Sequence, residues 1–297
     1  METNNESQAI VDCDPHTLRK ETAAFLALAA VLSVGVSSAM LARVLDGIPR
    51  GDADAIEQAL GGLTMVYGFA PFVAAVVVTA VFRRRQGLAG LFRRVTTWRV
   101  SPIWYLAALT VPLMPQWLGL LGWAWFSDAD LSLPPTGTYL SSWFQIALIS
   151  AVYFIGEELG WRGFLLPRLL AHRQWLTAAV SVGLIWAVWH YPYWIISGWA
   201  MNEHWLDIAL STMVSSGRAV ALSILITWIF RQSRGSVLIA MLFHGSNNAN
   251  FNKMFDAAGP DALIGPTFLA VQAIAVAVIA LCVVAMTRMR KSGHVLQ

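Results

Sequence analysis

Long apolar segments recur along the whole of this 297-residue sequence. A helix needs about 20 apolar residues to cross the hydrocarbon core of a bilayer. Eight runs approach or exceed this length: 22–45, 61–82, 102–126, 139–166, 175–196, 206–230, 235–251 and 262–287. Within lipid, only helices and closed barrels satisfy all of their backbone groups internally. The runs therefore predict an all-α, polytopic transmembrane helical bundle with about eight spans.

The composition agrees with a lipid solvent. Hydrophobic residues make up 57% of the sequence and charged residues 12%, whereas a soluble domain carries about 25% charged residues. Too little polar surface is available to cover a water-soluble particle of this size, so the lipid bilayer is the expected surrounding. No nucleic-acid partner is expected, because the arginines gather in loops that flank the membrane.

The chain is predicted to form one domain. We expect a cytoplasmic tail at 1–21, a transmembrane domain at 22–287 and a second cytoplasmic tail at 288–297. The first run is too long for a signal peptide and has no clear cleavage site, so it is interpreted as a retained span. The two cysteines, Cys13 and Cys282, form no Cys-x-x-Cys pair and predict neither a disulfide framework nor a zinc knuckle.

Basic residues predict the orientation. With both termini in the cytoplasm, most of the 20 Lys and Arg residues fall on the cytoplasmic side, as the positive-inside rule requires. They stand in these groups: Arg19 and Lys20; Arg83, Arg84, Arg85, Arg93, Arg94 and Arg99; Arg162, Arg168 and Arg173; Arg231 and Arg234; Arg288, Arg290 and Lys291. The opposite loops are acidic and contain Asp46, Asp52, Asp54, Glu57, Asp128 and Asp130. The arginine-rich stretch 84–101 is predicted to lie along the inner interface.

Polar and ionisable side chains inside the spans are candidates for function, because they are expensive in lipid. They concentrate in the second half of the chain: Glu157, Glu158 and Arg162 in the fourth run, His190 in the fifth, and His244 with Asn248 in the seventh. A Glu–Arg pair in a membrane helix often has only a structural role, and a single histidine often donates a hydrogen bond to a neighbouring helix. Adjacent glutamates are harder to explain structurally, since one arginine neutralises only one of them.

Helical spacing sorts these residues. Glu158 and Arg162 are four apart and are predicted to pair on one face. Glu157 is rotated by about 100° from Glu158, so it points elsewhere. His244 shares a face with the residue four positions later, and His190 lies on a third helix.

We therefore expect Glu157, His190, His244 and Asn248 to face one cavity. Such a group can hold a water molecule, remove its proton and stabilise an oxyanion. Arg218, in the sixth run, is instead expected to snorkel or to bind a carbonyl inside a helix, because its neighbours at 215–217 are small and allow close packing.

The three motifs resemble those of the CPBP family of intramembrane proteases, which includes Rce1-type CAAX prenyl endopeptidases and the bacterial Abi proteins. Glu157, Glu158 and Arg162 match Glu-Glu-x-x-x-Arg, and His244 with Asn248 matches His-x-x-x-Asn. The remaining motif, Phe-x-x-x-His, matches the stretch from Trp186 to His190, with Trp in place of the usual Phe. The resemblance covers about 140–252. Because the substitution keeps a large aromatic ring, we expect it to leave the chemistry unchanged.

The resemblance implies an endopeptidase that cleaves a membrane-associated peptide or protein. It also implies Glu157 as the base that activates water, assisted by His190, with His244 and Asn248 completing the site. No cofactor is favoured, and the alternative is a zinc ion held by Glu157, His190 and His244. The abundance of such proteins in bacteria favours a bacterial plasma membrane.

Two other functions remain open at this point. A proton-coupled transporter could use Glu157 and the histidines as a relay, although the sequence has no duplicated half and no matched pair of interrupted helices. A non-catalytic membrane partner, such as an immunity factor, could keep the same fold. Replacing Glu157 by Gln should abolish a protease and leave a partner protein working.

Overall fold

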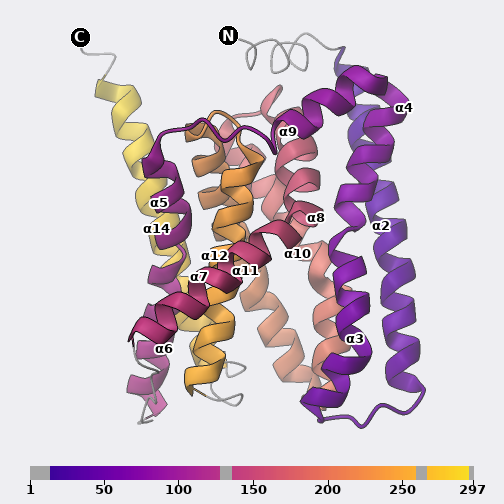
Figure 1. Cartoon of the computed structure of the whole chain (residues 1–297), viewed down its shortest axis with the longest axis vertical. Coiled ribbons are helices and arrows are strands. Elements are labelled where there is room, and N and C mark those ends of the chain that lie inside the picture. The colour runs from indigo at the N-terminus through magenta and orange to yellow at the C-terminus, as the bar shows by residue number, and fades with distance from the viewer. Residues whose placement is uncertain (1–13, 128–135, 259–265, 294–297) are drawn as a thin grey trace.

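A computed structural model describes residues 14–127, 136–258 and 266–293, and within these ranges every regular element is a helix. In chain order the elements are α2 (Pro15–Leu45), α3 (Ala53–Gly68), α4 (Ala70–Arg93), α5 (Pro102–Thr110), α6 (Leu113–Ser127), α7 (Thr136–Tyr153), α8 (Ile155–Glu158), the π-helix η1 (Leu159–Leu165), α9 (Leu166–Leu170), α10 (Trp175–Ala200), α11 (Trp205–Gln232), α12 (Val237–Ala258) and α14 (Pro266–Gly293). They form one bundle (Figure 1). The prediction of an all-α polytopic bundle is confirmed.

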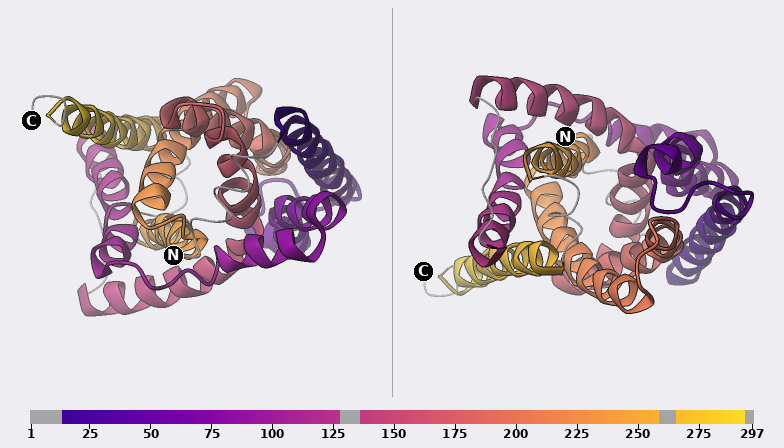
Figure 2. Two further views of the ribbon diagram at one scale, coloured as in Figure 1. Left: turned by 90° about the horizontal axis from the view of Figure 1, so that it is seen from above. Right: turned by 90° about the horizontal axis from the view of Figure 1, so that it is seen from below.

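The predicted spans correspond to these helices. Within the described ranges, seven helical segments are long and apolar enough to cross a membrane. The remaining run, at 235–251, forms α12, which extends along the bundle beside the others (Figure 1). Viewed along its length, the bundle encloses α12, which contacts α5, α6, α7, α8 and α11 (Figure 2). The helix that carries His244 is therefore in the middle of the molecule.

Two of the spans are pairs of helices and not single rods. The second is divided at Phe69 between α3 and α4, and Pro71 stands in the first turn of α4. The third is divided between α5 and α6, where Pro112 interrupts the chain. Proline has no backbone N–H to donate and clashes with the preceding turn, so these breaks have a local cause.

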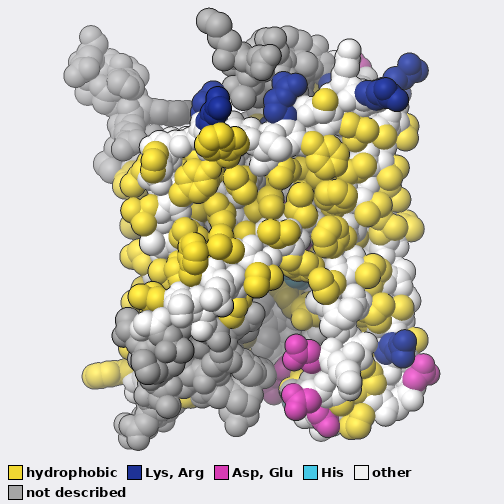
Figure 3. Space-filling model, in the orientation of Figure 1, with side chains coloured by type: hydrophobic (Ala, Val, Ile, Leu, Met, Phe, Trp, Pro, Cys, Tyr) yellow, Lys and Arg dark blue, Asp and Glu magenta, His cyan; other side chains and the backbone are white. Residues whose placement is uncertain are grey.

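Charges are sorted between the two ends of the bundle. The start of α2 and the end of α14 lie at the same end (Figure 1). On the face shown in Figure 3, most basic side chains lie along that edge and the acidic ones near the opposite edge. This arrangement agrees with an even number of crossings and with the positive-inside pattern. The cytoplasmic placement of both termini stays a prediction. Asp128, Asp130 and residues 1–13 and 294–297 lie outside the described residues.

The predicted N-terminal tail is partly helical. Helix α2 begins at Pro15, and the side chain of Asp14 caps it by accepting from Thr17 N at 3.1 Å. Glu21, placed in the tail by the sequence, is buried and pairs with Arg83 at 2.6 Å and Arg168 at 2.7 Å. One carboxylate thus joins α2, α4 and α9 at the basic end of the bundle.

Helix α4 bends near the end of the bundle. Arg84 has φ 52° and ψ −150°, a non-helical conformation that divides α4 into two segments. Figure 1 shows the second segment turning across the end of the bundle toward α9. The stretch 84–101 therefore lies at an end of the bundle, as the interfacial prediction requires. Arg162, which the orientation argument counted on the cytoplasmic side, is instead fully buried.

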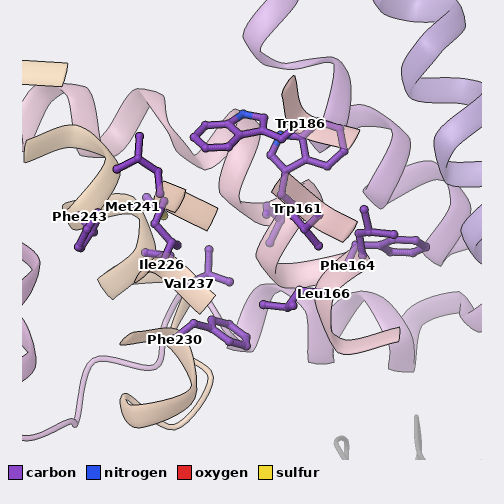
Figure 4. Packing of buried hydrophobic residues seen from close by; sticks show 14 of the residues in the cluster. Trp161, Phe164, Leu166, Trp186, Ile226, Phe230, Val237, Met241 and Phe243 are labelled. Carbon is purple, nitrogen blue, oxygen red and sulfur yellow. The ribbon is translucent and has the colours of Figure 1, made fainter. Parts of the chain in front are cut away.

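Small residues next to the motifs bring their helices close together. A Cβ on Gly160 would lie 2.7 Å from Pro71 O, so η1 touches the backbone of α4. A Cβ on Gly245 would lie 2.6 Å from both Ala147 O and Ala151 N, so α12 touches the backbone of α7. Close approach at small residues is the usual packing device of membrane helices. It positions η1 and α12 against their neighbours within the core cluster of Figure 4.

Candidate active site

The first motif lies at an interruption in the fourth span. From the sequence we expect the fourth run to be one helix that continues through Leu166, either tilted or with its start outside the membrane. The tilt is present, because α7 runs diagonally across the bundle and brings α8 to about mid-height (Figure 1). The continuous helix is wrong: α7 ends at Tyr153, Phe154 forms a turn, and the π-helix η1 follows α8. A π-turn changes the helical phase and is frequent at functional sites.

Glu158 is the centre of a buried ionic group. Its Oε1 accepts from Arg162 Nη1 at 2.9 Å and lies 2.9 Å from His244 Nδ1. Glu158 and Arg162 are fully buried, and the His244 side chain is nearly so. The pair predicted from helical spacing is present, whereas the contact with His244 was not predicted. A carboxylate paired with Arg162 can only accept, so His244 Nδ1 carries a proton and Nε2 is left for other partners.

Glu157 points to a different neighbour. Its Oε2 accepts a hydrogen bond of 2.7 Å from Nε1 of Trp186 on α10. The prediction that the adjacent glutamates face different ways is confirmed. Phenylalanine, the residue usual in the related motif, has no such donor. The expectation that Trp in place of Phe leaves the chemistry unchanged stays a prediction, and this hydrogen bond gives a reason to test it.

Trp186 also touches the other polar groups of this region. The guanidinium of Arg162 lies 4.8 Å from its ring centroid, within the range of a cation–π contact. The His244 ring meets it edge-on at 5.3 Å, and the His190 ring does so at 5.4 Å. Because both imidazole rings contact the same indole, the His190 and His244 rings lie on neighbouring positions around Trp186. One indole thus stands among Glu157, Arg162 and both histidines.

The tautomer of His190 follows from its backbone contact. Its Nδ1 lies 2.8 Å from the carbonyl oxygen of Trp186, one turn earlier on α10. A carbonyl only accepts, so Nδ1 carries the hydrogen and Nε2 of the neutral ring has a free lone pair. The ring also stacks on Trp194 at 4.9 Å, which holds its plane.

Asn248 lies one turn after His244 on α12 and is half-buried. Its Oδ1 accepts from Asn247 Nδ2 at 2.9 Å, which leaves its own amide N–H groups as donors. His244 is held by stacking on Phe154, with ring centroids 3.7 Å apart. The turn that interrupts the fourth span therefore also orients the histidine of the seventh.

The structure brings the predicted residues together to different degrees. Glu158, Arg162 and His244 make direct polar contacts, while Glu157 and His190 meet through Trp186. Sequence reasoning missed the contact between Glu158 and His244, since no spacing rule relates residues on different helices. It also missed the hydrogen-bonding role of Trp186, although the departure from Phe was a visible signal.

Several buried polar atoms of the site are available to a further partner. Within the described parts of the chain, Glu158 Oε2 and Arg162 Nε and Nη2 have no hydrogen-bond partner. Buried polar groups are nearly always satisfied in native proteins. These atoms therefore supply an acceptor and donors for water or for a polar group of a ligand.

The zinc alternative depends on the positions of its three expected ligands. Among the residues that the structure describes, no three His, Cys, Asp or Glu side chains gather closely enough to hold a metal. A catalytic zinc has three protein ligands and an open position. Here His244 Nδ1 is directed at Glu158 and Glu157 Oε2 at Trp186, so only the other nitrogen or oxygen of each side chain is left for a metal. We derive no step that passes through zinc, and chelation remains the direct test.

The same region of the chain has known relatives. Residues 139–250, which contain all six motif residues, match the family described as Type II CAAX prenyl endopeptidase Rce1-like. A segment of the chain is also 30% identical over 110 residues to "CAAX prenyl protease 2" from Methanococcus maripaludis. That alignment covers 35% of this chain and 38% of the relative, so the chain matches less than two-fifths of that protein.

Proposed function

We propose that this integral membrane protein is an endopeptidase that uses activated water to hydrolyse a peptide bond of a membrane-associated peptide or protein. Its Rce1-like region and the name of the Methanococcus relative support protease chemistry on a prenylated substrate. The observation that carries the proposal is the pair of buried glutamates with separate partners. Glu158 contacts Arg162 and His244, whereas Glu157 accepts a hydrogen bond from the indole of Trp186.

Glu157 acts as the base. Arg162 is directed at Glu158, so the Glu157 carboxylate keeps an oxygen, Oε1, that can take a proton from water. Nε2 of His190 accepts a hydrogen bond from the same water and aims its oxygen at the substrate carbonyl. Attack by the water oxygen gives a tetrahedral oxyanion. When the C–N bond breaks, Glu157 returns the proton to the leaving amine.

His244 and Asn248 stabilise the oxyanion. In its charged form the imidazole carries a proton on both nitrogens, so Nε2 donates to the oxyanion while Nδ1 donates to Glu158. The amide N–H of Asn248 is the second donor. Glu158 and Arg162 are positioning residues, because they hold the His244 ring and do not touch the reacting atoms. Each donor of this kind contributes about 100- to 1,000-fold in rate.

The test is cleavage by the full chain purified in detergent. The probe is a prenylated peptide ending in Cys-Val-Ile-Met, followed by mass spectrometry of its products. Glu157→Gln should abolish cleavage, while the matched change Glu57→Gln, at an exposed position of α3, should not. Wild-type activity in Glu157→Gln would remove Glu157 as the base.

The same variant separates the alternatives. If the wild type cleaves no peptide, and Glu157→Gln fully complements a deletion strain, the protein is a non-catalytic partner. Proton uptake into vesicles that depends on Glu157, without cleavage, would indicate a transporter.

A further inference from the structure

Arg218 on α11 is a cation inside a membrane span with no acidic partner in the described ranges. Its Nη1 donates to Oε1 of Gln272 on α14, where sequence reasoning expected snorkelling or a carbonyl inside a helix. Arg162, by contrast, is fully buried and paired with Glu158. A charge held within a bilayer without a counter-ion is costly and marks a functional position.

A chain of side-chain hydrogen bonds connects Arg218 to the candidate active site. Gln272 Nε2 donates to Gln116 Oε1 on α6. Gln116 Nε2 lies 3.2 Å from both the carbonyl oxygen and Oδ1 of Asn247, and Asn247 donates to Asn248 at 2.9 Å. Gln116, Gln272 and Asn247 are buried. This network of amide side chains joins α11, α14, α6 and α12. It fixes the position of the Arg218 side chain relative to Asn248 of the third motif.

Arg218 also lies close to the second motif. Ser216 Oγ, two residues earlier on α11, donates to Tyr191 OH at 3.2 Å, and Tyr191 follows His190 on α10. The guanidinium is within electrostatic range of the His190 imidazole. Arg218 is half-buried, and Gln272 is the hydrogen-bond partner of one of its donors. The charge therefore lies near the second motif, on a stretch of α11 that contacts α10 at Tyr191.

We infer that Arg218 is the receptor for the α-carboxylate at the C-terminus of the peptide substrate. This inference rests on the proposed function. A planar guanidinium binds a carboxylate through two parallel hydrogen bonds, and Gln272 occupies only one of its donors. The bound carboxylate supplies the missing counter-charge. It also sets the distance from the chain end to the bond presented to Glu157, so the enzyme acts on C-terminal segments.

The first experiment compares two prenylated peptides ending in Cys-Val-Ile-Met that differ only in a free carboxylate or a carboxamide. The wild type should cleave the acid with a kcat/KM about 10- to 100-fold higher than the amide. Arg218→Gln should abolish the preference for the acid, so that both peptides are cleaved with the same kcat/KM. Arg231→Gln, at the end of the same helix, is the matched control and should keep the preference.

A second measurement avoids dependence on the folding of a variant. Binding of the acid and amide peptides to the wild-type protein is compared directly, whether or not either is cleaved. The acid should bind about 10- to 100-fold more tightly. A third peptide has an amidated C-terminus and aspartate as its last residue. It tests whether a side-chain carboxylate can replace the α-carboxylate in binding to Arg218.

The outcomes decide the inference separately from the proposed function. Equal binding and cleavage of acid and amide by the wild type would overturn it while leaving the endopeptidase intact. An equal loss on both peptides in Arg218→Gln would show a structural role, and full recovery by the aspartate peptide would exclude recognition of the chain end. Undiminished cleavage of the acid peptide by Glu157→Gln would instead contradict the role of Glu157 as the base. It would not affect the inference about Arg218.

Discussion

Replacing Trp186 by Phe tests the contact that distinguishes this chain from the usual Phe-x-x-x-His motif. The change removes the 2.7 Å hydrogen bond to Glu157 Oε2 and keeps a ring beside Arg162 and His244. A hydrogen bond to a charged group contributes about 1.5–3 kcal/mol. If Glu157 must be an oriented carboxylate in the transition state, this loss lowers kcat by about 10- to 150-fold.

The assay is single-turnover cleavage of the prenylated peptide, with KM measured separately. The expected effect lies in kcat, because the indole N–H is directed at the proposed base and not at a substrate group. Trp189→Phe is the matched control on the same helix. Its Nε1 donates to the neutral Ser33 Oγ at 2.7 Å, and the smaller ring keeps an aromatic contact with His190. Trp189→Phe should lower the free energy of unfolding by about 1 kcal/mol. It should leave kcat close to the wild-type value.

Two results would refute the reasoning. Wild-type kcat in Trp186→Phe would mean that the hydrogen bond does not orient the base, as the sequence alone suggested. Equal losses of kcat in both tryptophan variants would mean that ring volume, and not the N–H group, supports the site.

Three further outcomes are expected. Glu21→Gln leaves Arg83 and Arg168 without their shared carboxylate, so the free energy of unfolding should fall by about 3–5 kcal/mol, against no change in Glu57→Gln. Thermal unfolding in detergent measures this, and an unchanged Tm would contradict it. Gly245→Ala places a Cβ 2.6 Å from the α7 backbone, so it should lower both Tm and the rate of cleavage. Wild-type values of both would show that α7 can move away at little cost in free energy. Treatment with a strong chelator should leave cleavage intact with no stoichiometric zinc by elemental analysis, whereas loss of activity with rescue by zinc would establish a metal mechanism.

The sequence determined the fold class and the contacts within single helices. Apolar runs of spanning length predict helices because a lone segment in lipid must satisfy its own backbone groups. The pair of Glu158 with Arg162, and the divergence of Glu157 from it, follow from the rotation per residue alone. These properties depend on neighbours within a few positions, so a single sequence contains enough information to predict them.

Contacts between helices were decided only by the tertiary structure. His244 and Glu158 are 86 positions apart, and no spacing rule joins them. The same helical phase is compatible with many crossing angles and depths, and the choice among them depends on the close approach at glycines and on the turn at Phe154. Arg218 shows this most clearly: its own segment suggested snorkelling, but the packing of α11 against α14 gave it a glutamine partner and a place near His190. In a membrane bundle all helices are apolar outside, so hydrophobicity cannot select neighbours, and side-chain fit between helices makes that selection.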